Sequence, residues 1–336
     1  MPLPARILSV VGLFTIVAPF YRLLRVLLDV YVLPGIPLST FQPNSSHRDQ
    51  ATWALITGAT DGIGKEFALQ LAKKGFNVVL ASRTQSKLDS VKQEVTAAAP
   101  GAQVKTVAID FSKAEDADYA RLEKEVQSVP LAILVNNVGM SHNKPVLFAQ
   151  SPVDELEAIT EINVRATLRV TRLAVPHLQR NKRSLILHLG SFAGSIPTPL
   201  LATYTGTKAF LIGWNRALNE ELRRDGVTSL LLNTYFVSTA MSKIRKSSWS
   251  VPTPKQYVSQ VLRKLGRPGS CYQEDRRGRE MTVWPQHALT EWAVRELVGL
   301  GRATKMSYSA QLDIRKRAIR REERLAVGEQ GGKKSQ

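Results

Sequence analysis

The stretch from Ser191 to Phe210, SFAGSIPTPLLATYTGTKAF, brings a hydroxyl, a phenol and an ammonium group close together along the chain. Tyr204 and Lys208 are four positions apart, so on a helix their side chains lie on one face. A phenol titrates at about pH 10, and an ammonium group beside it favours the phenolate, so the pair has the chemistry of proton transfer. Because a Tyr-x-x-x-Lys spacing also arises by chance, the surrounding elements decide whether these residues form an active site.

Apolar runs alternate with helical patterns over residues 51–235. The first run leads through TGATDGIG into a helical pattern that contains Phe67 and Leu71 and ends at Gly75, and a second strand follows over 78–81. This is a βαβ unit that opens a parallel sheet. The alternation predicts an α/β fold with a Rossmann-type doubly wound parallel sheet, covered by helices on both faces. Further strands are predicted at VKTVAID (104–110), LAILVNN (131–137), SLILHLG (184–190) and TSLLLNTY (228–235).

Glycines follow the first strand at Gly58, Gly62 and Gly64. A tight strand-to-helix turn of this kind brings the backbone close to a pyrophosphate and directs a helix N-terminus at negative charge. The second strand ends in ASR and lacks the carboxylate that holds the ribose hydroxyls of NAD, whereas Arg83 can pair with a 2′-phosphate. We therefore expect NADPH/NADP+ as the cofactor.

In chain order, TGATDGIG, NNVG, Asn163, Ser191 and YTGTK resemble the motifs of the short-chain dehydrogenase/reductase family, over residues 51–241. Ser191 precedes Tyr204 by thirteen residues, an interval typical of that family. NNVGMSH and NTYFVSTAMSKIRK are similar to the membrane-bound branch of very-long-chain 3-oxoacyl-CoA (beta-ketoacyl) reductases and related hydroxysteroid dehydrogenases. Where most of the family has Pro-Gly after the sixth strand, this chain has Tyr235-Phe236, a departure that the branch often shares.

The resemblance implies a catalytic tetrad. Tyr204 would give a proton to the substrate carbonyl oxygen as hydride arrives from NADPH. Lys208 and the positive nicotinamide ring would lower the pKa of that phenol, and Lys208 would also bond the nicotinamide ribose. Ser191 would hold the substrate carbonyl, and Asn163 would fix a water that relays protons toward Lys208.

The same resemblance implies the cofactor contacts. Asp110 matches the residue that bonds the adenine amino group, Asn137 and Gly139 match the segment beside the adenosine ribose, and Val237 and Thr239 match the loop that holds the nicotinamide carboxamide. The full set of expected cofactor-binding residues is Gly58, Thr60, Asp61, Gly62, Ile63, Gly64, Arg83, Asp110, Asn137, Gly139, Tyr204, Lys208, Val237 and Thr239.

Metal and disulfide chemistry are not expected. The five histidines show no metal-ligand spacing, and hydride transfer needs no metal. The single cysteine, Cys271, excludes an intramolecular disulfide and fits a reducing compartment.

The first 35 residues are mostly apolar, although Pro19, Arg22, Arg25 and Asp29 interrupt the run. Such a stretch either spans a bilayer with tilt or lies partly in the interface. The expected organisation is a membrane anchor and linker over 1–40, an NADPH-binding reductase domain over 50–280, and a basic helical extension over 281–336.

The net charge of +18 is concentrated near the C-terminus. Residues 243–280 carry ten Lys and Arg against three acids, and residues 302–336 carry ten against four. We expect the first segment to meet the phosphates of a long-chain acyl-CoA and the second to meet membrane lipid headgroups. Trp284 and Trp292 lie on a helical face that suits either a membrane interface or the protein's own core. No base-reading module is visible, so no nucleic-acid partner is expected.

The C-terminal KKSQ resembles the dilysine retrieval signal of endoplasmic reticulum membrane proteins, which places the catalytic domain on the cytosolic side of that membrane. The favoured function is NADPH-dependent reduction of very-long-chain 3-oxoacyl-CoA to 3-hydroxyacyl-CoA in microsomal fatty-acid elongation, beside other elongase-complex enzymes. Two alternatives stay open: the same chemistry on a steroid or on 3-ketosphinganine, and a non-catalytic scaffold, against which the intact tetrad counts.

Overall fold

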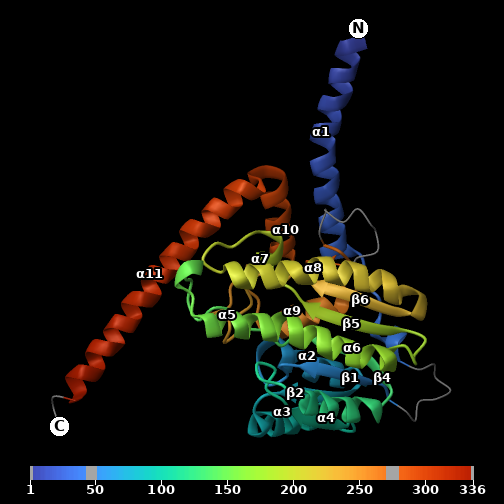
Figure 1. Cartoon of the computed structure of the whole chain (residues 1–336). Coiled ribbons are helices and arrows are strands. Elements are labelled where there is room, and N and C mark those ends of the chain that lie inside the picture. The colour runs from blue at the N-terminus through green and yellow to red at the C-terminus, as the bar shows by residue number, and fades with distance from the viewer. Residues whose placement is uncertain (1–2, 43–50, 270–279, 334–336) are drawn as a thin grey trace.

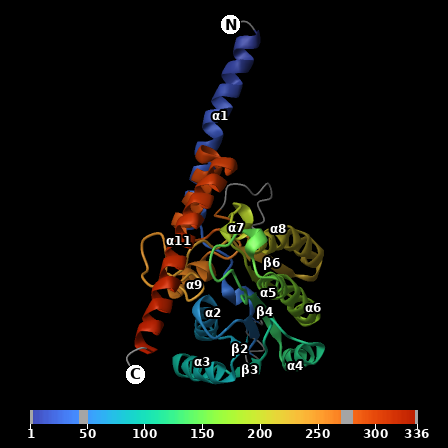
Figure 2. The same ribbon diagram turned by 60° about the vertical axis from the view of Figure 1, so that its left-hand side comes forward.

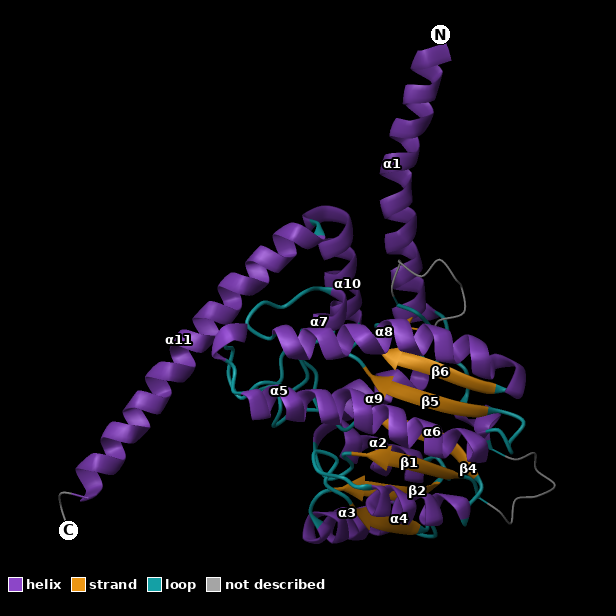
Figure 3. Ribbon diagram, viewed as in Figure 1, coloured by secondary structure: helices purple, strands orange, loops and turns teal. Residues whose placement is uncertain are grey.

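Seven parallel strands form one sheet, in the order β3-β2-β1-β4-β5-β6-β7, in a computed structural model that describes residues 3–42, 51–269 and 280–333 (Figure 1). Helices cover both faces of this sheet (Figure 3). The predicted Rossmann-type parallel sheet is thereby confirmed. The strands are β1 (Trp53–Thr57), β2 (Asn77–Ser82), β3 (Val104–Ala108), β4 (Leu131–Asn136), β5 (Ser184–Leu189), β6 (Val227–Leu232) and β7 (Glu280–Met281).

The core is divided between the two faces of the sheet because side chains alternate along each strand. On β1, Ala54 and Ile56 belong to one buried cluster, whereas Trp53 and Leu55 belong to a second. Helices of the first cluster are α2 (Gly62–Lys73), α3 (Gln85–Ala98) and α9 (Pro254–Arg263), and those of the second are α4 (Asp116–Gln127), α6 (Ala166–Leu178) and α8 (Ala202–Leu222). Other helical segments of the domain are η4 (Phe148–Gln150), α5 (Val153–Thr160), η5 (Glu161–Arg165), α7 (Phe192–Ser195) and η6 (Arg223–Asp225).

The N-terminal helix α1 (Leu3–Leu27) projects from the domain, and its inner end packs against α10 (Pro285–Ala293) and η7 (Val294–Val298) (Figures 1 and 2). The indole Nε1 of Trp292 donates a hydrogen bond to the carbonyl oxygen of Pro19 at 3.2 Å. Arg22 forms a 2.9 Å ion pair with Glu296. The inner part of α1 is therefore held by the segment that precedes the C-terminal helix.

The segment after α1 continues through η1 (Leu28–Val32) and η2 (Leu38–Phe41) into the reductase domain. The amide of Gln260 donates to the carbonyl oxygen of Val30, and the ammonium of Lys264 donates to that of Leu33. Phe41 is buried in the first core cluster. This part of the segment, expected to serve as anchor and linker, is thus fastened to α9.

A membrane anchor is expected at the N-terminus, in the region of α1. None of the helices in 3–42, 51–269 and 280–333 combines the length and the apolar character that crossing a bilayer requires. Pro19 lies inside α1, and Arg25 lies in its last turn. Large apolar side chains of α1 are nevertheless exposed, at Ile16, Val17, Phe20, Tyr21 and Leu24.

Strand β7 lies across the expected domain boundary at 280/281 and pairs with the end of β6. Trp284 packs against the first core cluster, and Trp292 bonds Pro19. Of the two alternatives left open for this helix, packing on the protein itself is therefore the one observed. Cys271 and the last residues of the dilysine tail lie outside the described residues.

The C-terminal helix α11 (Leu300–Lys333) leaves η7 and runs back past the domain (Figure 2). The guanidinium of Arg315 donates to the carbonyl oxygen of Pro145 at 2.8 Å and to the amide oxygen of Gln150 at 3.0 Å. Lys144 forms an ion pair with Glu322. The basic helix expected to contact lipid is thus fastened to the loop that follows β4.

Candidate active site

Ser191, Tyr204 and Lys208 converge where β5 ends and α7 and α8 begin. Ser191 is the N-cap of α7, where its hydroxyl accepts a 3.2 Å hydrogen bond from the Ala193 amide. The Tyr204 phenol is hydrogen-bonded to the Ser191 side chain. One turn further along α8, the ammonium of Lys208 lies 5.7 Å from the centre of the Tyr204 ring. The structure thus brings together the three residues singled out by spacing.

Gly194 explains how α7 approaches α8 this closely. A Cβ at Gly194 would lie 2.7 Å from the carbonyl carbon and oxygen of Lys208, a distance that real Cβ atoms essentially never show. A glycine is therefore required for the contact between α7 and α8 that sets Ser191 against Tyr204.

Burial dominates the electrostatics of the pair. It raises the pKa of the Tyr204 phenol, and the hydrogen bond with Ser191 opposes this only in part. The expected lowering of this pKa, which depends also on the charge of the bound oxidised nicotinamide ring, stays a prediction. Burial also lowers the pKa of Lys208 to about 8, and its ammonium donates a 2.7 Å hydrogen bond to the carbonyl oxygen of Leu189. The phenol keeps its proton at neutral pH, as a proton donor must.

Asn163 lies in the π-helical turn η5 and is 1% exposed. Its side chain accepts from the amide of Met140 and donates to the carbonyl oxygen of the same residue, both at 2.8 Å. It also donates to the Thr207 hydroxyl at 3.0 Å. A Cβ at Gly139 would lie 3.3 Å from the Asn163 oxygen and 3.7 Å from the Lys208 nitrogen. Asn163 therefore fixes the chain that passes Lys208, and its water-relay role stays a prediction.

A buried polar network surrounds His188 on β5, within electrostatic reach of Lys208. Nδ1 of His188 lies 3.1 Å from the amide nitrogen of Asn136, and Nε2 lies 3.1 Å from the hydroxyl of Ser229. Burial, with a smaller contribution from the Lys208 charge, lowers the pKa of His188 to about 3. The imidazole is therefore neutral at physiological pH, with Nδ1 accepting from Asn136.

The glycine-rich turn has the shape that a dinucleotide needs. Gly58 and Gly62 have φ angles of +63° and +54°, a region that L side chains rarely adopt. A Cβ at Gly64 would lie 2.3 Å from the Gly58 carbonyl oxygen. Asp61 is the N-cap of α2, and its carboxylate accepts from the Gly62 amide at 2.7 Å. The helix N-terminus beside Ile63 is thereby directed at the space above the turn.

Asn137 supports this turn from β4. Its side-chain amide donates to the carbonyl oxygens of Thr57 and Gly58 at 2.9 and 3.1 Å, and its backbone N–H donates to the Thr57 hydroxyl at 3.0 Å. Sequence reasoning placed Asn137 beside the adenosine ribose and had no signal for Thr57. Both residues join the first βα turn to the end of the central strand.

Arg83 and Asp110, the two residues expected around the adenosine end, follow the carboxyl ends of β2 and β3. The hydroxyl of Thr60 lies 2.8 Å from that of Ser82, and Arg83 beside it is exposed. The carboxylate of Asp110 accepts from the amide and hydroxyl of Ser112 at 3.1 and 2.7 Å. The chain continues from β2 as Arg83-Thr84, with no carboxylate, and these residues fit a 2′-phosphate.

The loop after β6 closes over the same turn. Val237 is buried in the first core cluster, and the methyl group of Thr239 would lie 3.2 Å from a Cβ at Gly62. The Ser242 hydroxyl lies 3.2 Å from the Thr239 amide and donates to the Val237 carbonyl oxygen at 2.7 Å. These contacts place the expected carboxamide loop against the glycine-rich turn.

A cavity of about 790 Å³ opens beside this turn. Asp61, Gly62 and Thr239 form its floor on the cofactor side. Five of the other lining residues are basic, and the sequence indicated a phosphate-binding role only for those of the 243–280 segment. Lysines and arginines that line the cavity are Lys65, Lys243, Arg245, Lys255 and Arg321.

The sequence and the fold of this chain are similar to those of known proteins. Residues 52–248 match the family model described as short chain dehydrogenase. A very-long-chain 3-oxoacyl-CoA reductase of Mycosarcoma maydis is 49% identical over 93% of this chain and 89% of its own length. One of Pyrenophora tritici-repentis is 47% identical over 94% and 91%. A short-chain dehydrogenase from Sphingobium yanoikuyae in complex with NADPH has the same fold, with a TM-score of 0.58 and 24% identity, over 68% of this chain and 87% of that one.

Proposed function

The chain belongs to the short-chain dehydrogenase family, and from that premise we propose that it reduces very-long-chain 3-oxoacyl-CoA to 3-hydroxyacyl-CoA with NADPH. The observation that carries the proposal is the identity of nearly half, over almost the whole chain, with relatives that bear this activity in their names. The arrangement of Ser191, Tyr204 and Lys208 supplies the chemistry that such a reduction needs.

NADPH supplies the hydride when it is bound above the glycine-rich turn. The Ser191 hydroxyl donates a hydrogen bond to the ketone oxygen and stabilises the negative charge that develops there. Tyr204, held protonated by burial, gives its proton to the same oxygen. Lys208, with its pKa lowered to about 8, carries a positive charge below that pH and stabilises the phenolate that remains.

The decisive experiment measures NADPH oxidation by the purified full chain. A long 3-oxoacyl-CoA, a keto-steroid and 3-ketosphinganine are compared at matched concentrations. We expect a kcat/KM for the CoA thioester at least about tenfold above the other two, because only the thioester carries phosphates for basic residues to recognise. A higher kcat/KM for either phosphate-free ketone would contradict the substrate assignment and leave the reductase chemistry in place.

We propose further that α1 attaches the protein to a membrane. Phe20 and Leu24 are 66% and 54% exposed, and clustered apolar side chains of this size mark an interaction surface. Flotation of the full chain with phospholipid vesicles tests this. We expect the Phe20→Ser/Leu24→Ser variant to lose most of its vesicle binding, whereas Thr304→Ser, a change of a half-buried residue on α11, should keep it. Equal binding of both variants would exclude α1 as the attachment.

We also propose the cytosolic face of the endoplasmic reticulum as the location, from the dilysine pattern KKSQ, and other elongase enzymes as partners, from the proposed reaction. In cells, Lys333→Ser/Lys334→Ser should redistribute the protein beyond the endoplasmic reticulum, whereas Lys316→Ser should not. Retention of the double variant in the endoplasmic reticulum would show that the C-terminal lysines do not determine the localisation.

A further inference from the structure

The basic cavity beside the glycine-rich turn draws its cations from parts of the chain that are distant in sequence. Lys65 comes from α2, Lys243 and Arg245 come from the loop after β6, Lys255 comes from α9, and Arg321 comes from α11. We propose that this cavity binds the phosphate groups of the nucleotide part of coenzyme A in the acyl-CoA substrate. The inference rests on the proposed function and gives its substrate a binding site.

Charge is the first argument. The five cations face two carboxylates in the lining, those of Asp61 and Glu66. Lys65 is paired with Glu94 at 2.7 Å. Within the described part of the chain, no ion pair joins Arg245, Lys255 or Arg321 to a carboxylate. A surplus of unneutralised cations in one cavity attracts a ligand with several negative charges, and a CoA carries a pyrophosphate and a 3′-phosphate.

Position is the second argument. Asp61, Gly62 and Thr239 belong to the turn and loop expected to hold the cofactor, and they occupy one side of the cavity. Lys255 and Arg321 lie outside every motif assigned to the cofactor. The cavity therefore adjoins the dinucleotide site but is built from additional elements, as a site for a second phosphate-bearing ligand must be.

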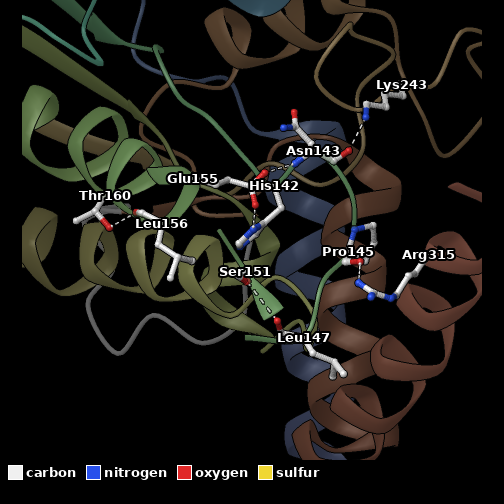
Figure 4. Close-up of polar contacts among 10 residues, drawn as sticks. All are labelled: His142, Asn143, Pro145, Leu147, Ser151, Glu155, Leu156, Thr160, Lys243 and Arg315. Atoms are coloured by element: carbon white, nitrogen blue, oxygen red, sulfur yellow. Dashed lines mark hydrogen bonds and ion pairs between the residues drawn. The ribbon is translucent and has the colours of Figure 1, made fainter. Parts of the chain in front are cut away.

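The walls of the cavity are fastened to the loop after β4. The Lys243 ammonium donates a 2.6 Å hydrogen bond to the Asn143 carbonyl oxygen, and the Asn143 amide donates to Glu155 at 2.9 Å (Figure 4). Arg315 bonds Pro145 on the same loop (Figure 4). Because α11 is held in this way, Arg321 is presented to the cavity by a fixed helix.

Charge reversal of the two outer cations tests the proposal. Lys255→Glu/Arg321→Glu is compared with Arg320→Glu, which changes an exposed neighbour on α11 that does not line the cavity. All three positions are exposed, so the fold tolerates these changes. KM values are measured for a 3-oxoacyl-CoA, for the same 3-oxoacyl group on N-acetylcysteamine, which has no phosphate, and for NADPH.

The expected result is a KM for the CoA thioester about tenfold or more higher in the double variant, with the KM for the N-acetylcysteamine thioester and kcat unchanged. Arg320→Glu should change the KM for the CoA thioester less than about threefold. An equal rise for both thioesters, or a rise in the KM for NADPH alone, would overturn the proposal. The second of these results would assign the cavity to the cofactor.

A binding measurement separates this inference from the proposed function. Calorimetric titration of coenzyme A into the NADPH-saturated protein requires no turnover. Weaker binding to the double variant than to Arg320→Glu supports the cavity even if neither thioester is reduced, an outcome that would contradict the proposed function alone. Equal binding to both variants would overturn the cavity assignment whatever the activity.

Discussion

Lys243 donates a 2.6 Å hydrogen bond to the carbonyl oxygen of Asn143, although one hundred positions separate the two residues (Figure 4). Lys243 has a φ of +56°, which is strained for a residue with a side chain. The bond joins the loop after β6 to the loop after β4. Two loops that are distant in sequence are thus held together by one ammonium group.

Lys243→Met keeps the length of the side chain and removes this bond. We expect backbone amides of residues 238–245 to exchange hydrogen about three- to tenfold faster, because local opening no longer breaks a charged hydrogen bond. Hydrogen exchange followed by mass spectrometry measures this, with the exposed Lys246→Met as the control. The same exchange rate in both variants would show that the bond does not restrain the loop.

Tyr204→Phe removes the proton donor and keeps the ring. We expect kcat to fall by about 10²- to 10⁴-fold, the usual contribution of general acid catalysis, with NADPH affinity changed less than about threefold. Single-turnover kinetics and fluorescence titration with NADPH measure the two effects. Tyr308→Phe, at an exposed position on α11, is the matched control. A Tyr204→Phe rate within about twofold of the unmodified rate would exclude the phenol as the donor.

Arg83→Asp places a carboxylate beside the expected 2′-phosphate. We expect the KM for NADPH to rise about tenfold or more, whereas that for NADH stays level or falls, because a carboxylate repels the phosphate and accepts from ribose hydroxyls. Initial rates with both cofactors test this, against Arg180→Asp at the far end of α6. Parallel losses for NADPH and NADH would refute the assignment of Arg83.

Gly64→Ala introduces a Cβ that would lie 2.3 Å from the Gly58 carbonyl oxygen and 2.4 Å from the Asn137 amide nitrogen. Neither neighbour can yield without opening the turn, so we expect a loss of about 1–3 kcal/mol in the free energy of unfolding and weaker NADPH binding. Gly213→Ala in α8 is the control, because no atom lies within 4 Å of its Cβ, and it should stabilise by about 0.5–1 kcal/mol. Equal unfolding free energies for the two variants would contradict the close contact.

His188 predicts a dependence of stability on pH. Its pKa is about 3 in the folded protein, below the ordinary value of about 6.5, so the unfolded chain binds the proton more readily as the pH falls. The contribution of His188 is fully present above about pH 6.5 and is lost progressively between about pH 6.5 and pH 3.

From about pH 7 to about pH 5, this loss amounts to about 2 kcal/mol of the free energy of unfolding. Urea denaturation at the two pH values measures it. His188→Asn should be less stable at neutral pH but lose less stability on acidification, because the titrating ring is gone. An unchanged pH dependence in His188→Asn would assign the acid sensitivity to other groups, such as His287, whose pKa burial lowers to about 4.

The strands and the glycine-rich turn could be predicted because their signals are local. A strand that is buried on both faces is a continuous apolar run, as in Leu131–Asn136, and a turn with positive φ angles selects glycine at Gly58 and Gly62. Strand β7 escaped prediction because it has two residues and no periodicity. Its pairing with β6 is a long-range contact that no window of sequence contains.

In the candidate site, too, local features could be predicted from the sequence and long-range contacts could not. Spacing indicated that Tyr204 and Lys208 share a helical face, but it gave no measure of burial, and burial sets the direction in which the pKa of Tyr204 moves. The basic character of α11 was evident, yet its place was not, because Arg315 and Pro145 are 170 positions apart. A charged helix suits a lipid surface and a protein cavity equally well until its contacts are known.

The contacts of Trp292 and Glu296 with α1 restrict how this helix moves relative to the domain. The 25 residues of α1 form a helix about 38 Å long, at about 1.5 Å per residue. Trp292 and Glu296 bind this helix at Pro19 and Arg22. A helix that is held near one end acts as a rigid connection rather than as a flexible linker. Whatever binds the outer end of α1 therefore also determines the distance and the orientation of the catalytic domain relative to it.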